Sequence, residues 1–544
     1  MKTVQKYLIF VLSVFLGLTS CNNHKPKDIP ASSTPSFVKV GAIRWDAWVG
    51  EKWAAGLEVE RILSGIPVSN PSAAAVTDYH FRVPWFGKIL PDNRVLARHT
   101  DILTVEREIR YAKAAGIDYW ATVWYGDQND ATGSLHRNLW VKSLQRNAFQ
   151  WCHIFDGNFR GAVGNGTSPA QKKLITDMVA IDFKSDAYVK TNSGRPVFYI
   201  HDAEGSYETC VNALFAECAS QGVPDPFVII GTFKTSTDDI NRVVAACRAS
   251  GISSYVVAGN NDLAYTSNAE TERDRWALWN RCDGVAIPTV TAGWDNRPRY
   301  YCGCPWYANI EDLRNSWIQY PTLAELQKQV EDAIKFTQTN PKATDFQSII
   351  IYARNEYDEG GYIAPTLFQL RDEGRPVKLD AINRAIQSTR VKYTDIQWNV
   401  AANEIRQLAS SYVFSGVSDD KFDPDKIVNV NEYTAWLVRT FGLYADTGNA
   451  TGNTQDNFAR EIDIAQALNI LNGQDVSRQG KALPITDEEV ILLTANVMKL
   501  LQMSDSDSDA RRIFNSIPET RMTRAKAAVM LTRCLELPFK NVNN

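Results

Sequence analysis

The chain of 544 residues has only six histidines and nine cysteines, and neither residue type forms a metal-binding pattern. The cysteines provide no Cys-x-x-Cys pair and no Cys/His cluster, so a zinc site is not expected. Lysine and arginine together number 58 against 62 acidic residues, and no basic patch is present, which argues against a nucleic-acid partner. Beyond the N-terminal region no apolar run is long enough to span a membrane. We therefore predict a protein without cofactor or metal.

The N-terminus has the pattern of an export signal. Lys2 and Lys6 precede an apolar run, Tyr7 to Leu18, which is too short for a membrane span but has the length of a signal core. The run ends in Leu-Thr-Ser-Cys at Cys21, which resembles the bacterial lipobox, and residues 22–36 are a polar tether with three prolines. We expect an exported protein whose only membrane contact is a lipid on Cys21, at the periplasmic face or the cell surface. A plain secretory leader with an incidental Cys21 is the alternative.

Residues 37–396 alternate apolar strand-like runs with amphipathic helices, which is typical of a βα barrel. We therefore predict an α/β fold, a (β/α)8 TIM-like barrel. Gly116 is expected to end the first helix. Strands are expected at 37–44, 117–125, 149–154, 195–200, 227–230, 254–258, 284–290 and 348–352. Helices are expected at 104–115, 172–179, 237–249 and 323–337.

Residues 397–544 show helices and no strand-like run. Three stretches there share a polar opening followed by an apolar-periodic helix, and they begin with the tetrads 429–432, 486–489 and 523–526. Recurrence of the turn, the cap and the helix length together indicates repeats. Three unrelated capped helices are the alternative. We predict a smaller all-helical repeat domain.

The most informative segment is residues 348–365. A buried strand, 348–352, runs directly into a loop that carries Glu356 and Glu359 and then a glycine pair, 360–361. In a parallel barrel the carboxyl ends of the strands hold the chemistry. Two carboxyl groups around one small site are what cleavage of a glycosidic bond requires. Glu356 and Glu359 are therefore the candidate catalytic residues, and a solvated acidic loop is the alternative.

Other candidates lie at the expected strand ends, where side chains can bind sugar hydroxyls or stack on sugar rings. The alternatives are packing for the aromatic residues and a structural ion pair for Asp295 and Arg299. The candidate substrate-binding residues are Asp46, Trp124, Tyr125, Asp156, Trp294, Asp295, Arg299 and Asn355.

Three blocks of this region, 183–198, 292–299 and 355–360, resemble motifs of glycoside hydrolase family 99 and its WbsX-type relatives. The blocks contain Asp-Ala-Tyr followed by Gly-Arg-Pro, then Gly-Trp-Asp-Asn-Arg-Pro-Arg, then Asn-Glu-Tyr-Asp-Glu-Gly. Their order and spacing agree with that group over residues 39–390. Tyr357 stands where the group usually has Trp, and the segments 44–48 and 80–87 do not look like the family. The resemblance implies a (β/α)8 barrel of a divergent branch.

The resemblance also implies roles for the two glutamates. Glu359 would be the acid/base that protonates the leaving oxygen, and Glu356 would take the proton of the sugar's 2-hydroxyl. The hydroxyl would then form a 1,2-anhydro intermediate, and hydrolysis would retain configuration. Without the resemblance, a nucleophile and an acid/base would be assigned. We predict a retaining glycoside hydrolase that acts on a poly- or oligosaccharide.

The C-terminal repeats resemble degenerate S-layer homology domains, whose helices commonly open with Thr-Arg-Ala-Glu. Only the tetrad at 523–526 keeps the arginine, Arg524, so a role in glycan contact or as a spacer is expected rather than wall anchoring. Two other functions compete with the hydrolase. One is a non-catalytic glycan-binding surface lipoprotein, and the other is a glycosyltransferase-like protein, although no nucleotide-sugar signature is present.

Overall fold

The computed structural model describes residues 37–125, 138–148, 150–203, 207–447, 458–475, 477–478, 481–503 and 505–537. The expected signal sequence, Cys21 and the tether lie outside the described residues. Val38–Asn544 form one compact unit. No helix in the described ranges has the length and apolar character needed to cross a membrane.

A single parallel sheet forms the centre of the fold. Its order is β10-β11-β1-β4-β5-β6-β7-β8-β9. The strands are β1 (Lys39–Arg44), β4 (Tyr119–Trp124), β5 (Gln150–Phe155), β6 (Val197–Ile200), β7 (Phe227–Gly231), β8 (Gly251–Ser253), β9 (Val285–Ala286), β10 (Thr289–Thr291) and β11 (Ser348–Tyr352).

The sheet closes into a barrel because its two end strands, β9 and β10, follow one another directly along the chain. Only Ile287 and Pro288 separate β9 from β10, and β9 pairs with β8 while β10 pairs with β11. Ile287 N donates to Ile252 O at 2.8 Å, and Pro288 O accepts from Ile350 N at 2.8 Å. The segment that contains β9 and β10 therefore hydrogen-bonds to β8 on one side and to β11 on the other. The predicted (β/α)8 barrel is confirmed, and β9 and β10 together take the place of one of its eight strands.

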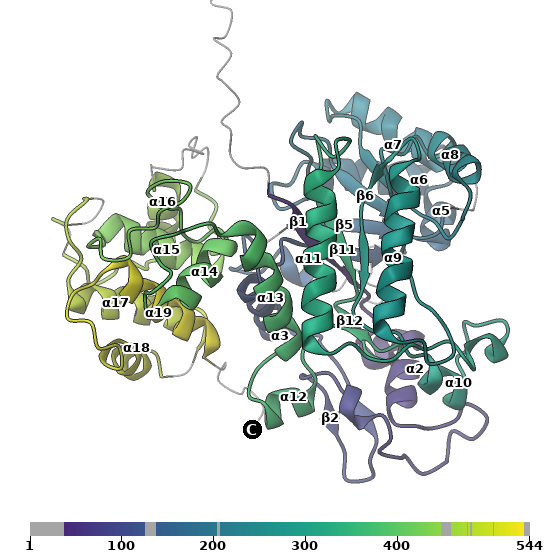
Figure 1. Cartoon of the computed structure of the whole chain (residues 1–544), viewed down its shortest axis with the longest axis horizontal. Coiled ribbons are helices and arrows are strands. Elements are labelled where there is room, and N and C mark those ends of the chain that lie inside the picture. The colour runs from purple at the N-terminus through teal and green to yellow at the C-terminus, as the bar shows by residue number, and fades with distance from the viewer. Residues whose placement is uncertain are drawn as a thin grey trace, which may run out of the picture. The chain divides into compact units, whose positions relative to one another are not determined.

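Helices cover the outside of the strands, as Figure 1 shows for α9, α11 and α13. The first, α3, begins at the cap Asp101, whose side chain accepts from Thr104 N, and it buries Val105 and Ile109. Gly116 follows the helix with φ +75°, the conformation predicted for its end. The helices are α3 (Ile102–Ala114), α5 (Gly157–Val163), α6 (Pro169–Asp177), the π-helix η3 (Met178–Phe183), α7 (Glu208–Ser220), α8 (Thr237–Ala246), α9 (Tyr265–Asn280), α11 (Leu323–Thr339) and α13 (Val377–Arg390).

One expected strand is wrong. The strand predicted at 254–258 ends earlier, since β8 covers only Gly251–Ser253. Beyond β8, side-chain hydroxyls of the adjacent strand accept or donate the hydrogen bonds that the backbone of that strand would otherwise make. Thr289 Oγ1 donates to Ser254 O at 2.7 Å, and Thr291 Oγ1 donates to Val257 O at 2.8 Å. The chain after Ser253 therefore no longer pairs as a strand, and it places Tyr255 at the carboxyl end of the barrel.

The long connections leave from the carboxyl ends of the strands and cover that end of the barrel. Figure 1 shows α2, β2, α10 and α12 gathered at the end where β12 lies. These elements follow β1, β10 and β11 in the chain. They are η1 (Gly50–Lys52), α2 (Ala54–Leu63), η2 (His80–Arg82), β2 (Lys88–Ile89), β3 (Val95–Leu96), α10 (Arg297–Cys302), η4 (Ile310–Leu313), β12 (Asn355–Glu356), β13 (Gly361–Tyr362) and α12 (Leu367–Asp372).

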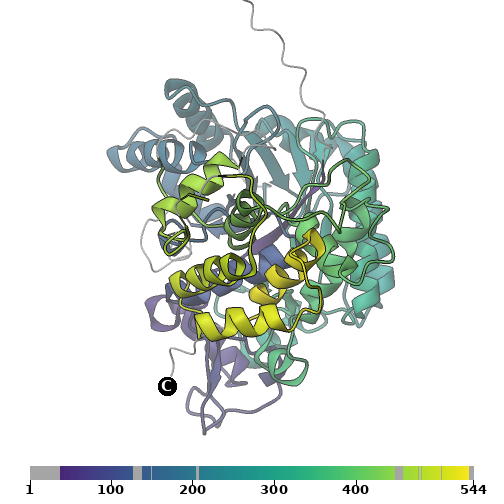
Figure 2. The same ribbon diagram turned by 90° about the vertical axis from the view of Figure 1, so that its left-hand side faces the viewer.

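The C-terminal helices have a hydrophobic core of their own, from Ile396 to Cys534. Figure 2 shows them, in light green to yellow, facing the viewer. The three predicted tetrads each open a helix, with Asn429, Thr486 and Thr523 as caps. The helices are α14 (Ala402–Ser410), α15 (Val430–Phe441), α16 (Ala459–Ala467), α17 (Asp487–Leu500), α18 (Ser506–Asn515) and α19 (Arg524–Glu536).

The segments that precede these capped helices are joined by backbone hydrogen bonds. Val428 N donates to Met522 O at 3.0 Å, and Ile485 N donates to Val428 O at 3.1 Å. Arg524 is buried, with its guanidinium 4.3 Å from the centre of the Phe422 ring. The arginine therefore packs inside the helical core.

Candidate active site

The loop that follows β11 brings Glu356 and Glu359 to the carboxyl end of the barrel. Both are buried, with exposed fractions of 3% and 6%. Asn355 anchors the loop to the end of β1, because its amide accepts from Trp45 N at 2.9 Å and donates to Trp45 O at 2.6 Å. Gly360 turns the chain with φ +77°, a conformation that favours glycine. The two carboxyl groups are thus held on a short, fixed backbone segment.

Glu359 is surrounded by hydrogen-bond donors. One oxygen, Oε1, accepts from Arg299 and, at 3.3 Å, from the hydroxyl of Tyr307. The other, Oε2, accepts from the hydroxyl of Tyr352. Three donors, one of them charged, favour the ionised form of this carboxyl group.

Glu356 has a different environment. Its Oε1 accepts from the hydroxyl of Tyr255 at 2.7 Å. Its Oε2 is 3.9 Å from Arg299 Nη2 and, within the described part of the chain, is buried without a hydrogen-bond partner. A buried carboxylate oxygen without a partner is costly, so this environment favours a proton on Glu356.

Arg299 lies between the carboxyl groups. It forms ion pairs with Glu359 and, through Nε at 2.7 Å, with Asp358, and it is within 3.9 Å of Glu356. Its guanidinium also lies over the Trp306 ring, 5.3 Å from the ring centre. One buried cation therefore faces three carboxyl groups.

The electrostatics of the pair follow from burial and from this charge balance. Burial raises the pKa of Glu356 well above 4.5, and the neighbouring Glu359 raises it further, against the opposing effect of Arg299. Burial also raises the pKa of Glu359, while Arg299 and the hydroxyl of Tyr352 lower it. Two adjacent carboxyl groups of this kind hold one proton between them more readily than two charges.

Charged residues that do not contact the two glutamate carboxyl groups hold the backbone of their loop in place. Asp295 is buried and accepts two hydrogen bonds from the guanidinium of Arg297, each 2.8 Å long. Arg82 pairs with Asp295 and donates to the backbone oxygen of Asp358 at 3.1 Å. Asp295 N donates in turn to Glu359 O at 2.6 Å. Asp295 and Arg82 therefore position the loop that carries Glu356 and Glu359.

Aromatic side chains surround the pair. Trp306 is 42% exposed and meets Trp45 edge to face, with ring centres 5.9 Å apart. Trp45 Nε1 donates to the hydroxyl of the half-buried Tyr125 at 2.8 Å. Trp294, also half-buried, lies against Tyr352 with ring centres 5.6 Å apart. Partly exposed rings beside two carboxyl groups are suited to stacking on sugar rings.

The other predicted binding residues divide into two groups. Tyr125, Trp294 and Asp156 are half-buried at strand ends, as expected. Asp46, in contrast, is 0% exposed and pairs with Arg44 at 2.6 Å.

Trp124 is buried as well, stacked on His153 with ring centres 4.2 Å apart. Contrary to the prediction, Asp46 and Trp124 therefore face protein groups rather than solvent. Asp295 and Asn355 hold the loop, and Arg299 lies between the glutamates.

The structure adds residues that the sequence reasoning missed: Arg82, Tyr255, Trp306, Tyr307, Tyr352 and Asp358. Tyr352 and Asp358 belong to the segment already selected, where the last residue of the strand and the centre of the motif were available signals. The other four come from distant segments and follow no motif. No group of three or more His, Cys, Asp or Glu side chains suited to a metal ion occurs in the described ranges.

Comparison with known proteins gives distant similarities. No protein-family model matches the chain. Among curated proteins, Exoglucanase XynX of Acetivibrio thermocellus is 24% identical over 128 residues. That match covers 23% of this chain and 12% of the relative, so the chain spans about an eighth of that protein's length.

Two solved glycoside hydrolases are also similar. A GH99 endo-alpha-mannosidase from Bacteroides thetaiotaomicron, in complex with BIS-TRIS-propane, has a TM-score of 0.39 at 16% identity, over 64% of this chain and 98% of that chain. A GH138 enzyme described as targeting pectin rhamnogalacturonan II has a TM-score of 0.32 at 11% identity, over 92% of this chain and 56% of that chain. Family 99, which the three sequence motifs resemble, is thus among the similar structures.

Proposed function

We propose that this protein is a glycoside hydrolase that cleaves O-glycosidic bonds of a poly- or oligosaccharide. The observation that carries the proposal is the pair Glu356 and Glu359, both buried at the carboxyl end of the barrel and both facing Arg299. Glycosidic cleavage needs one protonated and one ionised carboxyl group. The contacts of the pair supply that asymmetry, and the aromatic side chains around it suit a sugar.

The hydrogen bonds suggest which group holds the proton. Glu359 accepts from Arg299, Tyr307 and Tyr352, so it is the ionised member, whereas Glu356 has an unpartnered oxygen and is the protonated member. In this assignment Glu356 is the acid that protonates the leaving oxygen. The family resemblance implies the opposite roles, with Glu359 as acid/base. In both assignments we propose retention of configuration.

The first experiment is a digest of a glycan panel with the wild type and with the variants Glu356→Gln and Glu359→Gln. Glu488→Gln, on the exposed start of α17, is the matched control. Release of sugar by the wild type and the control, lost in both site variants, would establish the hydrolase and its substrate class. Release that survives both site substitutions would refute the site. Tight glycan binding by the wild type without turnover would instead identify a glycan-capture protein.

A second experiment separates the roles. An aryl glycoside of the released sugar with an activated leaving group needs little protonation, so the variant of the acid retains more activity on it than on the glycan. Our assignment predicts that Glu356→Gln shows this recovery and Glu359→Gln does not. Recovery by Glu359→Gln and not by Glu356→Gln would instead identify Glu359 as the acid, the role that the family resemblance implies. A 2-deoxy version of the substrate tests the 1,2-anhydro route, which requires the 2-hydroxyl.

We also propose that the chain is exported and anchored by a lipid on Cys21. The lysines before the apolar run and the lipobox-like end of that run support this proposal. Replacement of Cys21 by Ser should move the protein from the membrane fraction to the soluble fraction of a bacterial host. An unchanged distribution would refute the anchor.

A further inference from the structure

A cavity of about 560 Å³ lies at the other end of the barrel, between the strand starts and the C-terminal helices. On the barrel side it is lined by Lys39, at the first residue of β1, and by Gln150, at the first residue of β5. On the helical side it is lined by Ser411 and by residues of α15 and α16. Glu356 and Glu359 follow the carboxyl ends of the strands, so this cavity is separate from the candidate active site.

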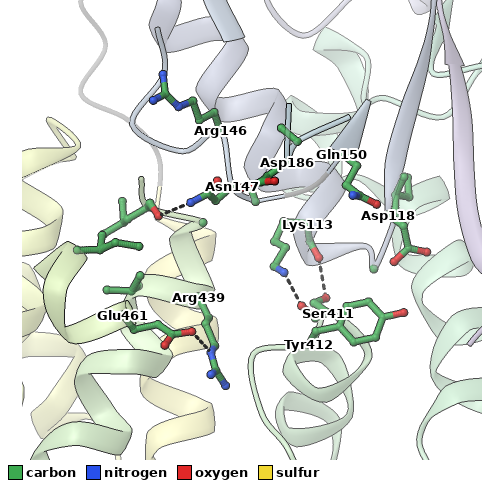
Figure 3. A pocket seen from close by; sticks show the side chains of 18 of the residues that line it. Lys113, Asp118, Arg146, Asn147, Gln150, Asp186, Ser411, Tyr412, Arg439 and Glu461 are labelled. Carbon is green, nitrogen blue, oxygen red and sulfur yellow. Dashed lines mark hydrogen bonds and ion pairs between the residues drawn. The ribbon is translucent and has the colours of Figure 1, made fainter. Parts of the chain in front are cut away.

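Positive charge predominates in the lining. The cationic members are Lys39, Lys113, Arg146, Arg439 and Arg460, and the acidic members are Asp118, Asp186 and Glu461. Two of the acidic groups are neutralised locally. Glu461 accepts from Arg439 at 2.8 Å, a pair visible on the helical side of Figure 3, and Asp118 pairs with Arg390.

The two lysines are not neutralised in this way. Lys113 Nζ donates to the backbone oxygen of Ser411, and Figure 3 shows the lysine beside that residue. Lys39 Nζ donates to Gln150 Oε1 at 3.0 Å. Within the described part of the chain, no carboxylate lies at ion-pair distance from either amino group. Each ammonium group has three donors and uses one in these contacts, so donors remain for a ligand.

Burial makes these charges costly. It lowers the pKa of Lys39, and it lowers the pKa of Lys113 to about 8, while the nearby Asp118 carboxylate acts in the opposite direction on both and Arg390 offsets part of that effect. An anion beside the two amino groups would remove part of that cost, because an opposite charge favours the charged form. The cavity is therefore better suited to an anionic occupant than to a neutral one.

The remaining lining suits a sugar. Gln150, Asn147 and Ser411 are neutral polar groups of the lining, and each already makes a hydrogen bond within the protein: Gln150 accepts from Lys39, Asn147 donates to Leu443 O, and Ser411 donates to Lys113 O. Their remaining donor and acceptor positions are of the kind that bind hydroxyls. Tyr412 is 44% exposed and has φ +58°, an uncommon backbone conformation for a bulky residue. Figure 3 shows its ring beside Asp118 at the cavity wall. The volume lies within the range of small-molecule sites.

We propose that this cavity is a second carbohydrate site, which binds a uronate-bearing oligosaccharide with its carboxylate held by Lys39 and Lys113. A uronate combines the one negative charge that the two amino groups favour with hydroxyls for Gln150 and Asn147. The site does not depend on the proposed hydrolase, since it shares no residue with that site. It would give the C-terminal helices a role in holding glycan against the base of the barrel.

The test measures binding by calorimetry with the full chain in a Glu356→Gln, Glu359→Gln background, which prevents cleavage. The probes are trigalacturonate, a hyaluronan tetrasaccharide, neutral maltotriose, and sulfate alone. We expect binding of at least one uronate probe and none of maltotriose. Lys113→Gln and Lys39→Gln should each weaken that binding by about tenfold or more, the effect of losing a charge-assisted hydrogen bond.

Two further variants complete the comparison, one outside the cavity and one at its rim. Lys173→Gln, on the exposed face of α6, should leave binding unchanged. Arg460→Gln removes an exposed charge from the cavity rim without disturbing the core, and we expect a smaller loss of affinity. Failure of both uronate probes to bind would overturn the proposal, as would binding that survives the double lysine substitution. Sulfate binding as tight as that of the uronates would show an anion site without sugar recognition, and would overturn it too.

Discussion

Replacement of Arg299 by Met tests whether one cation stabilises the acidic site. The substitution keeps much of the side-chain volume against Trp306 and removes the charge that faces Glu356, Asp358 and Glu359. Breaking a buried ion pair by removal of one partner costs about 3–5 kcal/mol, because the other charge stays buried. Here three carboxyl groups lose the same partner. We expect a loss of about that size in the free energy of unfolding near neutral pH.

The loss should depend on pH in a defined direction. Burial raises the folded-state pKa of Glu356 and Glu359 above 4.5, so the folded protein binds more protons than the unfolded chain above that pH. Stability contributed by these groups is therefore present at low pH and falls as pH rises through the folded pKa. Arg299 opposes the rise, so its removal raises both pKa values further. The destabilisation should be small at about pH 4.5 and larger at about pH 8.

Urea unfolding of the wild type and variant at both pH values measures this difference. Arg314→Met is the control, because Arg314 is exposed and its pair with Glu311 is 3.9 Å long, so its loss should change stability by less than about 1 kcal/mol. Arg299→Lys should recover only part of the loss, since an ammonium group cannot face three carboxyl groups as the guanidinium does. An equal loss at both pH values would refute the electrostatic reasoning and assign the effect to packing.

Three further substitutions test the site and the helical region. Gly360→Ala places a Cβ 2.6 Å from the Tyr320 hydroxyl at φ +77°, so we expect a loss of about 1–3 kcal/mol, measured by urea unfolding, and reduced turnover. Tyr255→Phe removes a donor that lowers the pKa of Glu356, so the alkaline limb of the kcat/KM–pH profile should move to higher pH; an unmoved limb would exclude Glu356 as the acid. Arg524→Ala should lower the melting temperature without changing turnover, because the side chain is buried among the C-terminal helices; an unchanged melting temperature would contradict that packing role.

Much of the barrel could be predicted because its signals are local. Seven of the expected strands overlap observed ones, since a strand buried on both faces is a continuous apolar run that can be recognised without its neighbours. The strand expected at 254–258 failed for a nonlocal reason. The hydroxyls of Thr289 and Thr291, on the adjacent strand β10, bind the backbone oxygens that would otherwise pair with a backbone N–H and extend β8.

The candidate site was predictable only in part. Glu356 and Glu359 could be found because their loop directly follows a recognisable strand, and a strand end determines where its loop lies. Asp46 also stands at a strand end, yet it is buried in an ion pair with Arg44. Position along a strand indicates the end of the barrel at which a side chain lies, but not whether a partner from another segment already occupies it.

The sequence by itself therefore determined the barrel, the loop with its two glutamates, and the capped C-terminal helices, because each depends on residues close together in the chain. Only the tertiary structure decided the state of the two glutamates. Arg299, Tyr255 and Tyr307 come from distant segments of the chain, and their hydrogen bonds distinguish Glu359 from Glu356. The cavity between Lys39 and Lys113 likewise exists only where the C-terminal helices meet the start of the strands. Charge and hydrogen bonding act over a few ångströms in space, a proximity that spacing along the chain does not reveal.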